Sequence, residues 1–137
     1  IAESILTEKA DVISFSCYIW NIEKILYIAE CLKKINQNIC IVLGGLEVSY
    51  DSKKVLKDNP YVDFVISGEG EIPFKMLLEE LNGNRCFDNV LSLTYRNNGE
   101  IFKNGNLEMQ NINNYSFVYD SKDDLKNKIV YSAKIKK

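Results

Sequence analysis

The sequence contains no histidine in its 137 residues. Histidine is the commonest general base and the commonest transition-metal ligand in proteins. A Ser-His-Asp triad or a histidine-rich metal site built by this chain alone is therefore excluded. The sequence also has no excess of basic residues, with 17 Lys and Arg against 19 Asp and Glu and a net charge of −2. Because binding to a phosphate backbone needs clustered Lys and Arg, we expect no nucleic-acid partner.

Long hydrophobic runs are missing as well. No apolar run reaches the roughly 20 residues that span a bilayer, and the first residues do not resemble a secretory signal. Hydrophobic residues make up 46% and charged residues 26%, which is typical of a globular domain. We therefore expect one domain, no membrane partner and a cytoplasmic location. Because the sequence starts with Ile1 rather than Met, we also expect it to be a piece of a longer protein.

The four cysteines form no C-x-x-C pair and match no zinc or cluster spacing. They are Cys17, Cys31, Cys40 and Cys86. Each lies in or beside an apolar stretch, which is typical of reduced, mostly buried thiols in a cytosolic protein. We predict no metal site and no catalytic residue in this chain.

A strand, a loop and a helix recur three times along the first 82 residues, and two of the three loops contain glycines. The predicted strands are 11–16, 39–43 and 62–66, and the predicted helices are 22–35, 52–58 and a segment from Pro73 to Asn82. We expect Asn21 to cap the first of these helices and Asp51 or Ser52 the second. Residues 1–9 have helical spacing too. This alternation predicts a parallel α/β sheet with helices packed against it.

The pattern changes after residue 90. Two apolar segments, 90–95 and 100–103, flank Asn97-Asn98-Gly99, which predicts an antiparallel hairpin because Asn-Gly readily adopts positive φ. We thus expect a flavodoxin-like or Rossmann-like, mostly parallel sheet that ends in this hairpin. Residues 1–103 would form the domain, and residues 104–137 a linker with one strand near 129–135.

The loops that follow the three predicted parallel strands are the candidate site, because ligands of open α/β sheets bind outside the carboxyl ends of the strands. The residues that we select in these loops are Ser16, Cys17, Tyr18, Trp20, Asn21, Gly44, Gly45, Glu47, Gly68, Glu69, Gly70 and Glu71. The glycine pair allows close approach of a bulky ligand, but it also fits a tight turn with nothing bound. Tyr18 and Trp20 could equally stack on a flat ligand or cover the sheet edge.

The glycines of the third loop do not form a dinucleotide site. Gly68 and Gly70 match half of that fingerprint but lack the third glycine, and Glu69 and Glu71 would repel a pyrophosphate. Glu71 fits a helix-dipole partner as well as a ligand contact.

Three motifs, in this order and spacing, resemble those of a known family. They are F-S-C-Y-I-W-N at 15–21, V-L-G-G-L-E-V-S-Y at 42–50 and G-E-G-E at 68–71. They resemble the cobalamin (vitamin B12)-binding domain that precedes the catalytic barrel of B12-dependent radical-SAM proteins, often labelled Fe-S oxidoreductases. In the wider cobalamin-domain family the pattern is D-x-H-x-x-G, then S-x-L, then G-G. Here Tyr18 replaces the leucine, and the first element would fall before Ile1.

The resemblance implies cobalamin as the cofactor. Ser16 would contact the dimethylbenzimidazole tail, Gly44 and Gly45 would line the slot for the nucleotide loop, and residues 68–71 would close the pocket. Without histidine in the chain, cobalamin would have no histidine lower ligand from it. The [4Fe-4S] cluster and S-adenosylmethionine would belong to a barrel on the same polypeptide, after residue 137, so we expect no activity from this piece alone.

Two questions stay open at this level. The chain could instead be a structural or interaction domain of the same enzyme that binds no cofactor. If the innermost strand of the sheet precedes Ile1, the edge at 12–16 is unpaired, and we expect it to form a homodimer or to pair with 129–135.

Overall fold

The central feature of the fold is a five-stranded sheet in the order β1-β2-β3-β4-β5. The computed structural model describes residues 5, 7–8 and 10–107. The strands are β1 (Val12–Ser16), β2 (Cys40–Gly44), β3 (Phe64–Ile66), β4 (Leu93–Asn97) and β5 (Glu100–Lys103). The first three are parallel, and β4 runs antiparallel to both of its neighbours. The predicted mostly parallel sheet with a C-terminal hairpin is therefore confirmed.

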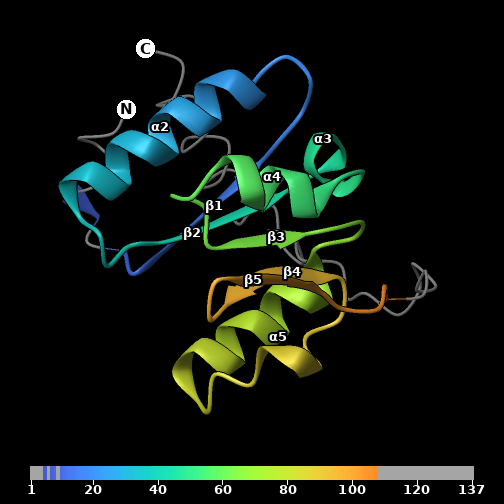
Figure 1. Cartoon of the computed structure of the whole chain (residues 1–137). Helices are drawn as coiled ribbons and strands as arrows, with labels where there is room; N and C mark the ends of the chain where they lie inside the picture. The colour runs from blue at the N-terminus through green and yellow to red at the C-terminus, as the bar shows by residue number, and fades with distance from the viewer. Residues whose placement is uncertain (1–4, 6, 9, 108–137) are drawn as a thin grey trace, which may run out of the picture.

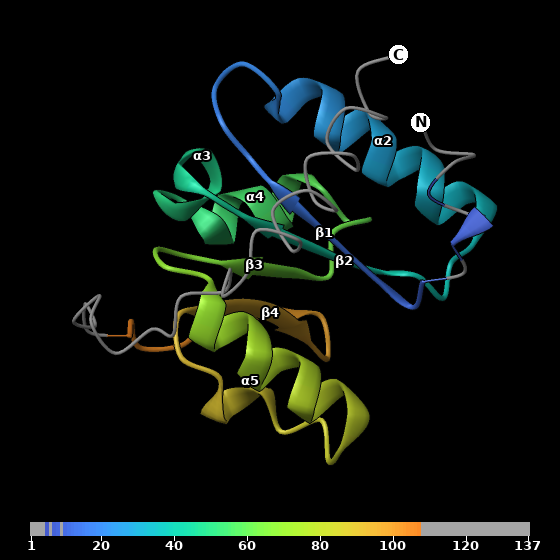
Figure 2. The ribbon, with the colours of Figure 1, turned by 180° about the vertical axis from the view of Figure 1, so that it is seen from behind.

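Helices cover both faces of this sheet. They are α2 (Ile22–Ile35), α3 (Leu46–Ser49), α4 (Ser52–Asp58), α5 (Glu71–Asn82) and the short 3-10 helix η1 (Phe87–Asn89). Figures 1 and 2 show α2, α3 and α4 on one face and α5 on the other. None of these helices is long and apolar enough to cross a membrane.

The middle strands are buried on both faces, so the core has two halves. Alternate residues of a strand point to opposite faces. Ile41, Leu43 and Val65 belong to the cluster under α2 and α4. Val42 and Phe64 belong to the cluster under α5. The continuous apolar run of β2, which predicted a strand covered on both sides, is confirmed.

Helix α4 is fixed at its start by two polar contacts. The Asp51 carboxylate accepts a hydrogen bond from the Lys54 backbone N–H at 3.1 Å, which confirms the predicted cap. Ser52 and Thr94 form a hydrogen bond of 2.7 Å between their hydroxyls. Both residues are fully buried, so this bond joins α4 to β4 inside the core.

The hairpin turns at Asn98 and Gly99, within the predicted Asn-Asn-Gly segment. Asn98 and Gly99 both have positive φ, of 49° and 84°, as a type I′ turn requires. The first strand of the hairpin, however, was predicted to begin at residue 90, and it begins at Leu93. The chain turns just before that strand, where Ser92 has a φ of 58°.

The first described residues and the first strand agree with the sequence-based predictions. Ile5 and Thr7 are helical, in agreement with helical spacing before the first strand. The predicted strand at 129–135 lies outside the described residues. Strand β1 is an edge of the described sheet, as expected.

The hydroxyl pair between Ser52 and Thr94 provides a test of the core. Replacing Ser52→Ala leaves the Thr94 hydroxyl buried without a partner, which costs about 1–3 kcal/mol. We expect the free energy of unfolding in urea to fall by that amount. The double variant Ser52→Ala with Thr94→Val, which removes both hydroxyls, should recover part of the loss. Equal stability of Ser52→Ala and the unmodified chain would contradict this account.

Candidate functional site

The loops after β1, β2 and β3 meet at one edge because these strands are parallel. The Cys17 backbone N–H donates to the Gly44 carbonyl at 2.7 Å, and the Glu47 N–H donates to the Cys17 carbonyl at 3.3 Å. Gly45 lies between these bonds with a φ of +100°. A Cβ on Gly45 would lie 2.5 Å from the Cys17 carbonyl oxygen, so only glycine fits there.

Ser49 joins the second loop to the third. Its Oγ donates to the Gly45 carbonyl at 2.7 Å and accepts from the Gly68 N–H at 3.1 Å. Ser49 ends α3, a helix that the sequence analysis did not predict. Four residues are too few to display helical periodicity, so the sequence carried no usable signal for it.

A hollow of about 410 Å³ lies between these loops. We call it the strand-end hollow. It is lined by Ser14, Phe15, Ser16, Tyr18, Val42, Leu43, Gly44, Gly45, Ile66, Gly68, Glu69, Gly70, Glu71 and Phe74. Pockets for small molecules span roughly 300–1,000 Å³, so the hollow has the size of a ligand site or of part of one. All three predicted loops contribute to it.

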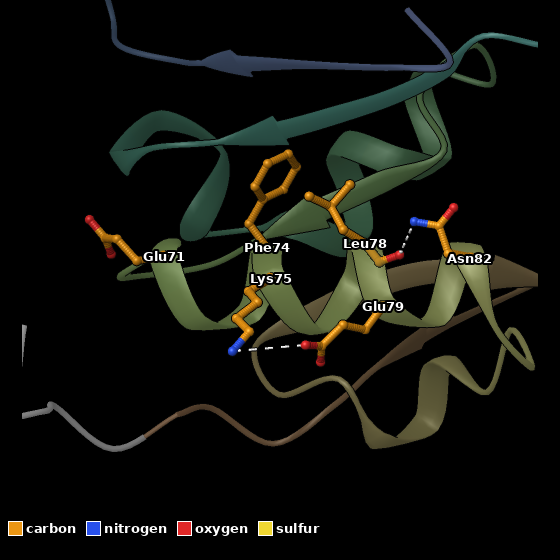
Figure 3. Close-up of a pocket in the computed structure, with 6 residues that line it drawn as sticks. All are labelled: Glu71, Phe74, Lys75, Leu78, Glu79 and Asn82. Atoms are coloured by element: carbon orange, nitrogen blue, oxygen red, sulfur yellow. Dashed lines mark hydrogen bonds and ion pairs between the residues drawn. The ribbon is translucent and has the colours of Figure 1, made fainter. Parts of the chain in front are cut away.

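An apolar groove continues from this hollow along α5. Glu71 and Phe74 line both spaces, and the groove, of about 530 Å³, also includes Leu78. Figure 3 shows Phe74 and Leu78 on the side of α5 that faces β1 and β2. We call this space the α5 groove. The site thus combines polar loops at the strand ends with an open groove along α5, where Phe74 and Leu78 lie among charged and polar side chains.

Four of the residues selected from the sequence do not line the strand-end hollow. Cys17 is buried, and its backbone supports Gly45. Trp20 is 76% exposed and stacks on Tyr18, which is 36% exposed, with ring centroids 4.8 Å apart. Glu47 lies on α3, among the residues of a separate surface pocket.

Asn21, the fourth of these residues, stands at the N-cap position of α2, as predicted, but its side chain makes no capping hydrogen bond. Its Oδ1 accepts from the Tyr18 N–H at 2.7 Å, and its amide donates to the Ser16 carbonyl at 3.0 Å. The side chain is therefore occupied by the preceding loop rather than by the helix N–H groups. Asn21 holds the loop that carries Tyr18.

The strand-end hollow offers a ligand neither a positively charged side chain nor a reactive thiol. The strand-end hollow contains two carboxylates, Glu69 and Glu71, and no Lys or Arg among its lining residues. Burial, and to a lesser extent the charge of Glu47, raises the pKa of the Cys17 thiol to about 11. Cys17 is thus a protonated thiol at neutral pH and a poor nucleophile. The described part of the chain holds no group of three or more Cys, Asp or Glu side chains placed to bind a metal.

Comparison with known proteins assigns the family. The model of the B12 binding domain matches residues 1–78, a segment that includes all three loops of the site. The chain belongs to the B12-binding domain family. The resemblance seen in the three sequence motifs is therefore confirmed.

Two curated relatives have similar segments. An uncharacterized methyltransferase of Pyrococcus horikoshii is 35% identical over 74 residues, which are 54% of this chain and 16% of that protein. The cobalamin-dependent radical SAM methyltransferase TokK of Streptomyces tokunonensis is 37% identical over 70 residues, 51% of this chain and 10% of that protein. The match thus spans only a small part of the length of each relative.

A solved structure has the same fold. It is the cobalamin-dependent S-adenosylmethionine radical enzyme OxsB with aqua-cobalamin and S-adenosylmethionine bound. The TM-score is 0.67 at 19% sequence identity, over 78% of this chain and 15% of OxsB. The flavodoxin-like arrangement of this B12-binding domain is confirmed by that likeness.

The two adjacent glycines give a matched pair of variants. Gly45→Ala forces a clash with the Cys17 backbone and places alanine at φ 100° and ψ 172°, a region that is essentially restricted to glycine and that alone costs about 1–3 kcal/mol. For Gly44→Ala, the nearest atom to the added Cβ is the Ile66 carbonyl oxygen at 3.9 Å, an ordinary contact. We expect urea denaturation to give a clearly larger loss of stability for Gly45→Ala than for Gly44→Ala. Equal losses would refute the close contact.

The four cysteines, all free, should differ in reactivity. Cys86 is exposed, so the prediction of mostly buried thiols is wrong for this residue. Burial raises the pKa of Cys17 to about 11 and that of Cys40 to about 12. At pH 8 we expect iodoacetamide to modify Cys86 first and to leave these two thiols intact, as measured by peptide mass spectrometry.

The same thiols make stability depend on pH. Because Cys17 and Cys40 keep their protons more strongly when folded, their contribution to stability is complete below the unfolded thiol pKa of 9.0. It is lost as the pH rises from 9.0 through the folded pKa, which is about 11 for Cys17 and about 12 for Cys40. The control for the iodoacetamide experiment is the same reaction in urea, where all four cysteines should be modified. Modification of Cys17 as fast as Cys86 at pH 8 would contradict the structure.

Proposed function

We propose that this chain holds cobalamin at the carboxyl edge of β1, β2 and β3. The observation that supports this proposal is the strand-end hollow. It is formed around Gly45 by the three loops, all of which lie in the segment that matches the B12 binding domain. We place the nucleotide tail in the hollow and the α5 groove, and the corrin ring over the loops outside. Bound cobalamin supplies cobalt-centred transfer chemistry, for which the chain provides position and shape.

The residues present fit this assignment. Phe74 offers an aromatic face to the flat benzimidazole base, and Ser14 and Ser16 bring hydroxyls to the hollow's edge. The hollow is smaller than a whole corrinoid, so the ring must lie outside it. Tyr18 and Trp20 stand beside that surface as one stacked pair. Since the chain has no histidine, it offers the cobalt no imidazole ligand.

Further parts of the proposal concern the longer protein. Relatives such as TokK are much longer than the matched segment and carry a radical SAM name. We infer that a radical SAM barrel with a [4Fe-4S] cluster and S-adenosylmethionine shares the polypeptide, in the cytoplasm, with 104–137 as its linker. Strand β1, at the edge of the described sheet, is where a homodimer contact would form.

A substitution at Ser14 tests the location of the ligand. Ser14 is exposed on β1, two residues before Ser16, and lines the hollow. In Ser14→Phe the new ring fills the hollow, so we expect the affinity for hydroxocobalamin to fall at least tenfold in a spectral titration. Ser14→Ala, which keeps the space open, should bind within about threefold of the unmodified chain.

The outcomes separate the cofactor-binding domain from a purely structural one. Thermal unfolding of each variant first establishes that it is folded. No spectral change and no retention of hydroxocobalamin by the unmodified chain would support the structural alternative. Unchanged affinity in a folded Ser14→Phe variant would instead refute the hollow as the binding place.

A further inference from the structure

One buried hydroxyl in the domain is left without a partner. Ser67 follows β3 directly and is 7% exposed. Its Oγ is the only buried side-chain oxygen or nitrogen, among the residues that the structure describes, with no hydrogen bond. Such groups are rare in folded proteins, because a buried polar atom loses its contacts with water. An unpaired hydroxyl of this kind calls for an explanation.

Ser67 lines a second pocket, of about 390 Å³, which we call the serine pocket. Two further serines contribute to it, Ser49 from α3 and Ser92 from the turn before β4. The Ser92 Oγ accepts from the Leu107 N–H at 2.8 Å, and its N–H donates to the Gly105 carbonyl at 2.8 Å. These bonds hold the chain after β5 in place as one wall of the pocket.

The serine pocket adjoins the strand-end hollow. Gly68 and Glu69 line both spaces, and Ser49, whose hydroxyl accepts from the Gly68 N–H, lines the serine pocket. A ligand in the hollow could therefore extend an arm past Gly68 into the serine pocket. Gly68, with a φ of +76°, has no side chain to block that passage.

The groups around the serine pocket are balanced in charge. Its lining includes one cation, Lys103, one anion, Glu69, and one amide, Asn106. None of these three side chains has a hydrogen-bond or ion-pair partner in the described part of the chain. A bound oxyanion would be attracted by Lys103 but repelled by Glu69. A neutral group that both donates and accepts, such as a primary carboxamide, matches the whole set.

We propose that the serine pocket receives a carboxamide arm of the corrin ring, with the Ser67 hydroxyl as one of its partners. This inference rests on the proposed cobalamin function. It adds a contact for the ring in the serine pocket, which is separate from the α5 groove. A bound carboxamide would then supply the hydrogen-bond partner that the Ser67 hydroxyl lacks among the described residues.

The test compares two corrinoids on the 137-residue chain. Hydroxocobalamin carries the nucleotide tail, whereas aquacobinamide lacks the tail and its phosphodiester but keeps the ring amides. For Ser67→Ala we expect the affinity for both to fall about fivefold, the loss expected for one hydrogen bond. The midpoint of thermal unfolding should not fall, because the variant removes an unpaired buried hydroxyl.

Ser52→Ala is the matched control. This substitution removes a buried hydroxyl that has a hydrogen-bond partner, the Thr94 hydroxyl. Ser52 lines neither the serine pocket nor the strand-end hollow. It should lower the unfolding midpoint and leave both affinities unchanged. An equal loss of affinity in Ser52→Ala would mean that stability, not contact, governs binding, and would overturn the inference.

The remaining outcomes are equally distinct. Unchanged affinity in Ser67→Ala would overturn the inference while leaving the proposed function intact. A loss for hydroxocobalamin alone would place the phosphodiester, not a ring amide, in the serine pocket and would overturn it too. If the unmodified chain binds neither corrinoid, the proposed function fails and this inference fails with it.

Discussion

The close approach of Gly45 to the Cys17 backbone determines the shape of the whole strand-end region. The Cys17 N–H binds the Gly44 carbonyl at 2.7 Å, so the loop after β1 is fixed to the end of β2. This fit is possible only because Gly45 has no Cβ and can adopt positive φ. Once the two loops are joined, Ser49 can reach Gly68 and bring in the third. The strand-end hollow depends on this chain of contacts.

The contacts that build the region are mostly backbone bonds and single hydroxyls, not ion pairs. Of the four ion pairs described at 10–107, only Lys75–Glu79 borders the site, at the α5 groove. Three of the four join residues one helical turn apart on the same helix. Surface pairs of that kind contribute little to stability and are screened by salt. A site held by backbone geometry keeps its shape over a wide range of ionic strength. Its side chains are thereby left available for a ligand.

The sequence was enough to predict the parallel βα units, the hairpin that follows them and the three loops, because the spacing of apolar residues and of glycines indicates these features directly. It could not predict the role of Asn21, since a cap and a loop bridge need the same amide before a helix. Nor could it place Phe74 beside Ser14, because their contact with one hollow arises from packing across 60 positions of chain. Ser67 had no signal at all: being unpaired is a property of the folded surroundings.

The chemistry of the strand ends favours a ligand recognised by shape and hydrogen bonds over one recognised by charge or coordination. The hollow has two carboxylates, no lining cation and a protonated thiol below it, and the chain has no histidine to offer a metal. A polyanion would be repelled there, and a bare metal ion would find too few ligands. A large cofactor that carries its own metal and only a single phosphodiester charge needs neither. It needs a slot, an aromatic face and several polar partners, and the loops, Phe74 and the serines supply these.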